Sequence, residues 1–316
     1  MDKMPVTTVT PVTPATPVIV TRPLHDAVRW VDALRQRGLA AEALPLINIT
    51  PATDPRPIHA AWQHLSRYRA LMFVSGNAAQ HFFALRPLPV PGGAYIETAG
   101  KRQGPHDGRV GANVDAKVDA NVDLRVDANL GLDFGSNASP AHRCWATGPG
   151  TLAALRHAGV PAQAIDTPDV SAGQFDSEAL WEIVAPSVQP GDHVLIVRGG
   201  APGGESAGRN WFASQLLSRG AAVDFVVAYE RHPPNWSAAQ QTRARLAARD
   251  GSIWLLSSSE AVGHLGQTLP GTCLANARAV ATHPRIAEAA RSAGFGVVCE
   301  SRPTLGDVAA SIESLA

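Results

Sequence analysis

The chain alternates short apolar runs with longer stretches in which apolar residues recur at helical spacing. Runs at 18–20, 70–74 and 193–197 have the length of buried strands. The stretch 27–37 has helical periodicity and ends at Gly38, a residue typical of helix ends. Strands separated by about ten helical residues predict parallel sheets covered by helices. The expected fold class is therefore α/β.

The same pattern predicts the remaining elements. Before the first helix, Thr21 is a candidate N-cap and Pro23 suits the first turn. Further strands are expected at 43–49, 143–147, 223–229, 253–256, 279–282 and 297–299. Further helices are expected in a stretch ending at 84 and at 151–157, 177–184, 210–218, 260–265, 285–293 and 305–315.

Two pairs of segments resemble each other in the same order along the chain. LMFVSGNAAQHF (71–82) and WLLSSSEAVGHL (254–265) each read as an apolar run, a serine-containing turn and a helix. WATGPGTLAALRHAGV (145–160) and AVATHPRIAEAARSAGFGV (279–297) form the second pair. This internal echo predicts two related α/β halves and not one large sheet.

Two segments fall outside the pattern. Residues 1–17, rich in Thr, Val and Pro, are expected to form a solvated tail and lack the apolar core of a signal peptide. Residues 101–142 contain tandem Val-Asp repeats between 114 and 129. This insertion is expected to be a mobile loop, with a β-hairpin as the alternative, and no function is attached to it. No apolar run reaches the 18 residues typical of a membrane span, so no membrane partner is expected.

Composition narrows the possible partners and compartment. The 27 basic residues balance the 27 acidic ones, so the chain has no net field to attract nucleic acid, and none is expected as a partner. Three widely spaced cysteines indicate no disulfide framework, which fits a reducing cytoplasm. Of the basic residues, 24 are Arg and 3 are Lys. This excess has two interpretations: genomic base composition, or guanidinium groups that bind carboxylates.

Two glycine-rich turns follow predicted strands. The turn at 148–153 matches a loose G-x-G-x-x-A pattern and has three interpretations: a dinucleotide site, a carboxylate-binding turn or a structural turn. The loop 199–208, with Arg198 and Arg209 at its ends, suits either a carboxylate ligand or an ordinary surface role. The histidines show no metal-binding spacing, and the sequence contains no strong catalytic motif. The sequence therefore favours a reaction controlled by the shape in which a reactive substrate is held.

Eight segments, taken in order, carry a family resemblance. They are TRP (21–23), LPL (44–46), FVSGNA (73–78), ATGPGT (146–151), GDHVLIVRG (191–199), RNWFASQLLSRGAAVDFVVAYER (209–231), LLSSSEAV (255–262) and THPRIAEAARSAGF (282–295). Apart from the tail and the insertion, the chain resembles the uroporphyrinogen-III synthases.

The resemblance implies two similar α/β domains with parallel sheets, joined by two β-like linkers around a cleft. The first domain is expected to contain 18–44 and 230–316, and the second 45–229 with the insertion 101–142. The tail, 1–17, belongs to neither.

The resemblance also implies an activity. The family is a cyclising hydro-lyase of tetrapyrrole (haem) biosynthesis, which converts hydroxymethylbilane to uroporphyrinogen III with loss of water and inversion of ring D through a spiro intermediate. It implies no cofactor and a cytoplasmic monomer. The substrate carries eight carboxylates, so a neutral chain must hold it by local donors, and the main task is to pre-organise it and to stabilise developing charge.

Site residues follow from the family motifs. Tyr229 in VVAYER is expected to assist departure of the hydroxyl, and an aromatic that only packs the linker is the other interpretation. In the second half, Thr282-His283-Pro284-Arg285 departs from the glycine-type turn of the family, and Arg285 replaces backbone donors with a guanidinium. Substrate binding is expected from Arg22, Ser75, Thr147, Gly148, Gly150, Thr151, Arg198, Gly199, Ser257 and Arg285.

Two other functions stay open at this point. One is a non-catalytic two-domain binder or sensor of a small polycarboxylate. The other is a nicotinamide-dependent oxidoreductase that uses the turn at 148–153. Isomer analysis of the product and saturable binding of the nicotinamide cofactor discriminate among the three.

Overall fold

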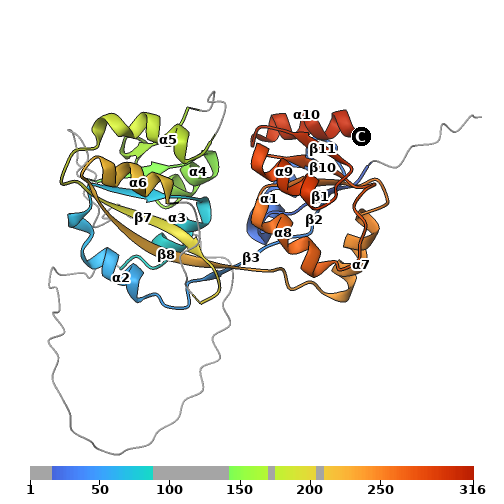
Figure 1. Ribbon diagram of the computed structural model, residues 1–316, viewed down its shortest axis with the longest axis horizontal. Coiled ribbons are helices and arrows are strands. Elements are labelled where there is room, and N and C mark those ends of the chain that lie inside the picture. The colour runs from blue at the N-terminus through green and yellow to red at the C-terminus, as the bar shows by residue number, and fades with distance from the viewer. Residues whose placement is uncertain (1–15, 88–141, 170–174, 204–209) are drawn as a thin grey trace, which may run out of the picture.

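The computed structural model describes residues 16–87, 142–169, 175–203 and 210–316 (Figure 1). These residues form two α/β units, each with its own sheet. Unit 1 contains β1 (Val18–Val20), β2 (Ala41–Ala43), β9 (Ile253–Leu256), β10 (Arg278–Ala281), β11 (Val297–Glu300), α1 (Leu24–Arg35), α7 (Ala238–Ala247), α8 (Ser259–Thr268), α9 (Pro284–Ser292) and α10 (Leu305–Leu315). Unit 2 contains β3 (Asn48–Pro51), β4 (Ala70–Phe73), β5 (Arg143–Ala146), β6 (Ile165–Asp166), β7 (His193–Gly200), β8 (Ala222–His232), α2 (Arg56–Gln63), α3 (Gly76–Ala84), α4 (Pro149–His157), α5 (Ser177–Val184), α6 (Trp211–Ser218) and 3-10 turns at Leu65–Arg67, Ala162–Ala164 and Ala185–Ser187.

The two sheets have the same strand order. Unit 1 has β11-β10-β9-β1-β2, and unit 2 has β6-β5-β4-β7-β8 followed by β3 at its edge. Every pair is parallel except β3 with β8. The α/β class is confirmed, and the expectation of wholly parallel sheets needs one correction, at β3.

The pairing registers show which residue of unit 1 is equivalent to which residue of unit 2. Ala70 in β4 pairs with Val194 and Arg143, while Ile253 in β9 pairs with Val18 and Arg278. The strands β4, β5 and β7 therefore correspond to β9, β10 and β1, which confirms the two related halves that the sequence echo predicts. Because β1 begins unit 1 whereas β7 follows β4 and β5 in unit 2, the two copies differ in where the chain enters them.

Each sheet is covered on both faces. In unit 1, alternate residues of the strands pack either against α1 and α10 or against α7, α8 and α9. In unit 2, one face packs against α2, α3 and α4 and the other against α5 and α6. Strands buried on both faces explain the continuous apolar runs in the sequence.

The chain crosses between the units through extended segments that lie side by side. β3 pairs with the far end of β8, with Asn48 opposite His232. Just beyond this pair, the indole N–H of Trp236 donates to the carbonyl of Pro45 at 2.8 Å. The two crossings thus hold each other, as the resemblance implies for β-like linkers (Figure 1).

Several predicted elements have different bounds in the structure. The run 43–49 is not one strand: β2 ends at Ala43 in unit 1, and β3 begins at Asn48 in unit 2. The segment between them contains Pro45, which has no N–H to continue a ladder. The first helix begins at Leu24 after Pro23, and Thr21 is not its cap, because its hydroxyl donates to the carbonyl of Leu255.

The strand predicted at 193–197 continues to Gly200, so the predicted loop 199–208 is wrong at its start. Two helices and one short strand, α2, α7 and β6, are absent from the predictions. The tail up to residue 15 and the insertion 101–142, His142 excepted, lie outside the described residues. Within the described ranges, no helix has the length and apolarity needed to span a membrane.

Candidate active site

The predicted site residues gather at the carboxyl ends of the strands. In open α/β sheets, ligands bind at this edge, where the strand order reverses. In unit 2 the reversal lies between β4 and β7, and Ser75 and Gly199 lie at the ends of these two strands. In unit 1 it lies between β1 and β9, which Arg22 and Ser257 follow.

Tyr229 lies in a tight cluster with Ser75 and Gly199. Its side chain is buried, with 4% of its surface exposed, and its hydroxyl lies 3.1 Å from the hydroxyl of Ser75. Ser75 caps α3, since its oxygen accepts the N–H of Ala78. A Cβ on Gly199 would lie 2.6 Å from Cε2 of Tyr229, closer still to Cζ of the same ring, and 2.5 Å from Nη1 of Arg231. Only glycine leaves room for this ring, so the structure brings these three predicted residues together.

His81 is a further neighbour of Tyr229 that the sequence does not indicate. The two rings are stacked, with centroids 5.8 Å apart. Burial lowers the pKa of His81. The imidazole is therefore neutral at pH 7 and presents a flat, uncharged wall to the tyrosine.

Arg22 and Arg198 occupy equivalent positions, four residues beyond Val18 and Val194 in the matched registers. Each guanidinium lies over an aromatic ring, at 4.3 Å from that of Trp30 for Arg22 and 4.1 Å from that of Phe225 for Arg198. In each, the buried Nε has no hydrogen-bond partner.

Burial lowers the pKa of both arginines, to about 10 for Arg22. Arg231 adds to the effect at Arg198 through charge repulsion. Both side chains remain protonated at pH 7. A desolvated guanidinium with an unused N–H is suited to a carboxylate.

The turns that precede α4 and α9 are also equivalent, but they end differently. Thr147 and Thr282 start them and hydrogen-bond to the carbonyls of Val74 and Leu256. Gly148 then caps α4 without a side chain, whereas the ring of His283 accepts the N–H of Arg285. The first turn of α4 thus lacks the side-chain acceptor that α9 supplies for itself.

The other residues of the α4 turn lie close to α3. The carbonyl of Gly150 would lie 3.0 Å from a Cβ on Gly76, so the two helices approach closely. Thr151 is buried, and its N–H donates to the carbonyl of Gly148. Gly150 itself has open space where a Cβ would stand.

The matching of Ser75 with Ser257 is off by one residue. Ser258 caps α8 through the N–H of Ala261 and is the register equivalent of Ser75. Arg285 is exposed on the first turn of α9. The sequence alone does not fix this register, because three serines follow each other at 257–259.

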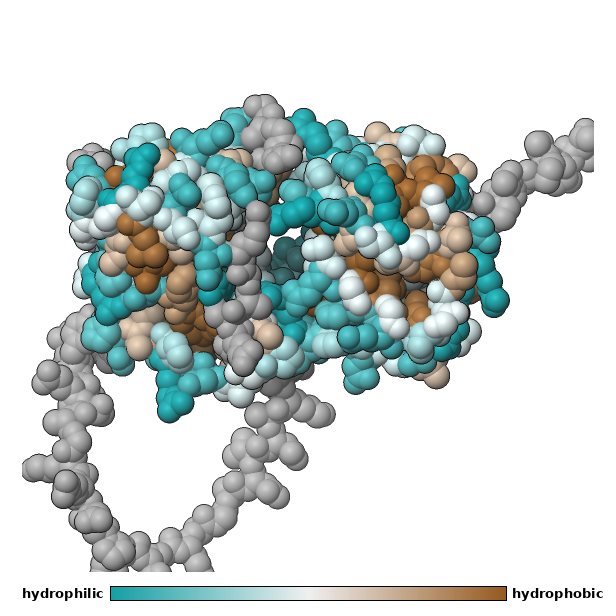
Figure 2. All heavy atoms as spheres, viewed as in Figure 1, coloured by the Kyte–Doolittle hydropathy of each residue, from teal (hydrophilic) through white to brown (hydrophobic). Residues whose placement is uncertain are grey.

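The carboxyl edges of the two sheets face each other. Nε2 of His283 in unit 1 lies 3.9 Å from a carboxylate oxygen of Asp176 in unit 2. A cavity of about 280 Å³ is lined by Phe175 of unit 2 and by residues 282–284 and 300–303 of unit 1. Figure 2 shows an opening between the units, with hydrophilic side chains along its unit 1 side.

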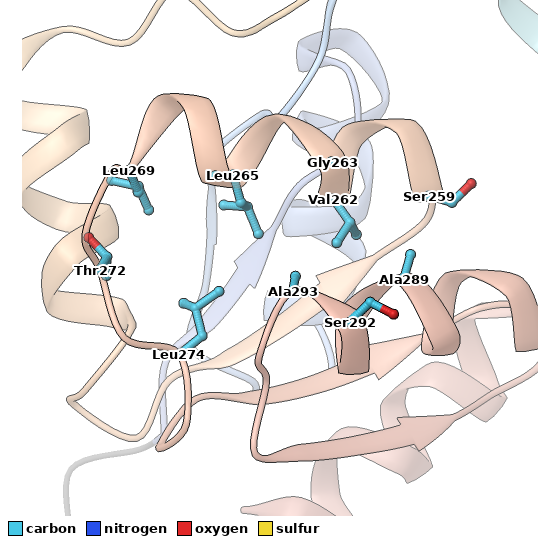
Figure 3. Close-up of a pocket in the computed structure, with 11 residues that line it drawn as sticks. Ser259, Val262, Gly263, Leu265, Leu269, Thr272, Leu274, Ala289, Ser292 and Ala293 are labelled. Carbon is cyan, nitrogen blue, oxygen red and sulfur yellow. The ribbon is translucent and has the colours of Figure 1, made fainter.

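A larger cavity, of about 400 Å³, lies between α8 and α9 (Figure 3). Its walls are apolar or small, and no charged side chain lines it. Figure 3 shows Val262, Leu265 and Leu274 pointing into it. Such a groove offers nothing to a polycarboxylate, so the polar edge between the units is the better candidate site.

Two further residues of the site, Arg231 and Glu260, lie within family motifs but are absent from the predicted site residues. Arg231 follows Tyr229 on β8, and its Nε lies 2.6 Å from a carboxylate oxygen of Glu260 on α8. The pair joins the two units, and only the fold brings these residues together. Across the described ranges, no group of three or more His, Cys, Asp or Glu side chains is placed to hold a metal ion.

Comparison with known structures finds the same fold. Uroporphyrinogen-III synthetase from Helicobacter pylori aligns over 95% of this chain and 99% of its own, with 15% identity and a TM-score of 0.50. A mutant uroporphyrinogen III synthase from the extremely thermophilic bacterium Thermus thermophilus aligns over 95% and 98%, with 14% identity and a TM-score of 0.49. No curated protein matches the chain in sequence.

A family model described as uroporphyrinogen-III synthase HemD matches residues 28–92 and 128–310. The match covers most of both units, including the turns that begin α3, α4, α8 and α9 and the end of β8, whereas β1 and Arg22 precede it. The chain therefore belongs to the uroporphyrinogen-III synthase family.

Proposed function

We propose that the edge between the two units binds hydroxymethylbilane and that Tyr229 acts on its hydroxyl. The activity follows from the family: cyclisation to uroporphyrinogen III, with loss of water and inversion of ring D. The main support for this location of the active site is the cluster of Tyr229, Ser75 and Gly199, where the strand order of unit 2 reverses.

In this mechanism the phenol O–H of Tyr229 donates its proton to the departing hydroxyl, which leaves as water. The hydroxyl of Ser75, 3.1 Å away, donates to the phenolate that remains. The organic product of this step is an azafulvenium cation. The substituted carbon of ring D attacks it to give the spiro intermediate, which fragments, recloses with ring D inverted and releases a proton to regenerate the tyrosine. Positioned proton transfer of this kind contributes roughly 10²–10⁴-fold to a rate.

Arg22 and Arg198 are proposed to bind carboxylates on opposite walls of the site. This role is supported by three features that the two arginines share: each is desolvated, lies over an aromatic ring and has an Nε–H without a hydrogen-bond partner. Two such anchors fix two points of a flexible substrate and reduce the shapes in which it can close. The turn residues Thr147, Gly148, Gly150 and Thr151 are proposed to add backbone and hydroxyl donors at the uncapped start of α4. Ser258, which takes the place expected for Ser257, and Arg285 are proposed to contribute from the unit 1 side.

The decisive experiment supplies hydroxymethylbilane in situ and analyses the isomers of the oxidised product. The type III isomer is expected; only type I, at the uncatalysed rate, would contradict the function and favour a non-catalytic binder. Tyr229→Phe should lower turnover at least about tenfold, since it removes the proton donor. Tyr68→Phe is the matched control, because Tyr68 is equally buried and its hydroxyl donates to Asp224 away from the site.

The arginines have their own test. Arg22→Gln and Arg198→Gln should each raise KM with a smaller effect on kcat, whereas Arg245→Gln, on the exposed face of α7, should change neither. An unchanged KM in both site variants would remove the arginines from the proposal and leave Tyr229 untouched.

We further propose that the protein is a cytoplasmic monomer with two domains, 18–44 with 230–316, and 45–229. The boundary at 230 falls within β8, whose last three residues pair in the unit 2 sheet. The paired crossings and the separate sheets support the division, and three cysteines without a disulfide support a reducing compartment. Light scattering of the purified protein tests the monomer, and a dimer mass would contradict it.

A further inference from the structure

Arg231 lies beside Tyr229 and shares its surroundings. The two residues are two positions apart on β8 and so point to the same face of the sheet. The guanidinium carbon of Arg231 lies 6.0 Å from the centre of the tyrosine ring, and Nη1 lies against Gly199. Its side chain is only 16% exposed. A cation in this position is within reach of any carboxylate carried by a substrate that contacts Tyr229.

Glu260 holds this cation from the other unit. Its carboxylate lies 2.6 Å from Nε of Arg231, as an ion pair without hydrogen-bond geometry, and within the first turn of α8, where the helix dipole favours negative charge. It lies at the carboxyl end of β9, beside the switch point of unit 1. A helix start at this edge of an open sheet is a place where anionic ligands bind. Glu260 thus fills, with its own carboxylate, a position suited to a carboxylate of the substrate.

We propose that Glu260 is an internal competitor, which a substrate carboxylate displaces from Arg231 when the substrate binds. The inference rests on the proposed function. Arg231 then becomes a substrate-binding residue, and Glu260, 43% exposed, turns toward solvent. The exchange keeps the guanidinium paired in both states, which avoids leaving a largely buried charge alone.

A second observation supports the exchange. Arg231 is close enough to Arg198 to lower the pKa of that group. Release of Glu260 therefore removes the carboxylate that pairs with Arg231, one of these two neighbouring cations. This arrangement attracts a polyanion and discriminates against substrates that lack the carboxylate.

The competition predicts an unusual kinetic result. Glu260→Gln should lower KM for hydroxymethylbilane by about twofold to fivefold, the range expected from loss of one partly exposed ion pair, with kcat nearly unchanged. Arg231→Gln should raise KM. In the Arg231→Gln background, Glu260→Gln should no longer change KM, because the group for which it competes is gone.

The controls separate this result from general effects of charge or stability. Glu313→Gln removes an exposed carboxylate from α10 and should leave KM unchanged. Glu260→Ala removes the carboxylate without leaving an amide and should repeat the fall in KM, and thermal unfolding checks that each variant is folded. A KM that rises or stays constant in both Glu260 variants would overturn the inference.

Failure of the inference and failure of the function are distinguishable. If the wild-type protein makes the type III isomer and the Glu260 variants leave KM unchanged, only the exchange is wrong. If the wild-type protein yields only the type I isomer at the uncatalysed rate, the proposed function itself is wrong, and with it the exchange.

Discussion

The strand β8, beside β7 in unit 2, is equivalent to β2, beside β1 in unit 1. Comparing these two strands shows how the two copies of one fold differ in function. β2 has three residues, whereas β8 has eleven, and the extension of β8 pairs with β7 as far as Glu230 and with β3 as far as His232. Tyr229, Glu230 and Arg231 all lie on this extension, for which β2 has no counterpart.

Other groups occur twice. Arg22 matches Arg198, Ser258 matches Ser75, and Thr282 matches Thr147, all at the carboxyl edges of the sheets. Groups proposed to bind the substrate thus occur on both walls of the site, whereas the group proposed to transfer a proton occurs on one wall only.

The largest expected effect tests this asymmetry at Gly199. Gly199→Ala places a methyl group against Cζ and Cε2 of Tyr229, so the ring must shift from its contact with Ser75. We expect turnover to fall at least about tenfold, as for loss of the proton donor itself. Steady-state kinetics on folded protein measures it. Gly263→Ala in unit 1 makes the same chemical change where nothing lies within 4 Å, and equal turnover in the two variants would show that the close packing at Gly199 is irrelevant.

A smaller effect is expected at the turn of unit 1. His283→Gly removes the side-chain acceptor of α9 and its approach to Asp176, which makes this turn resemble that of α4. Replacing a capping side chain by glycine costs only about a few tenths of a kcal/mol, so the midpoint of urea unfolding should fall slightly while type III product is still formed. An unchanged midpoint would mean that the imidazole does not cap the helix in solution.

The extension of β8 also carries a pH dependence. Hydrogen bonds from Thr53 hold the pKa of Glu230 below its ordinary value. A carboxyl group with a lowered folded pKa stabilises the fold above its unfolded pKa, and this stabilisation is lost as pH falls through the folded value. Stability should therefore drop below about pH 4.5, and Glu230→Gln should make this acid limb less steep. An identical acid limb in the variant would exclude Glu230 as the titrating group.

The smallest effect concerns the cysteines, one in unit 2 and two in unit 1. Burial raises the pKa of Cys144 to about 12, so its thiolate is scarce at pH 8. Iodoacetamide should modify the exposed Cys273 and leave Cys144 intact until the protein unfolds, as peptide mass spectrometry can show. Rapid labelling of Cys144 would mean that β5 opens readily.

The sequence predicts the repeated parts of the molecule better than the parts that differ. Strands such as β4 and β9 are buried on both faces, so their apolar runs are continuous and their bounds agree with prediction within one residue. At 43–49 the apolar pattern continues through a change of sheet, because Leu44, Leu46 and Ile47 are buried in the crossing itself. The apolar pattern reflects burial, and it does not record which sheet provides the partner.

The site residues, too, fall into those that the sequence predicts and those that it does not. Ser75, Gly199 and Tyr229 were predictable from family motifs, and the structure brings them into contact. The ion pair of Arg231 with Glu260 was not, since the two residues are 29 positions apart on different units and the motifs that contain them do not indicate that they meet. One missed helix did leave a signal: Ser237 and Gln240 form a capping box at the start of α7.

The pairing of β1 with β9 has a consequence for synthesis on the ribosome. β1 and β2 leave the exit tunnel first, but β9, which pairs with β1, begins only at Ile253. All strands of unit 2 have emerged by His232, so that unit has every sheet partner it needs while unit 1 still lacks three of its five strands. The two crossings then place β1 and β2 beside the arriving C-terminal half, and the last part of the chain to be made closes the sheet that the first part began.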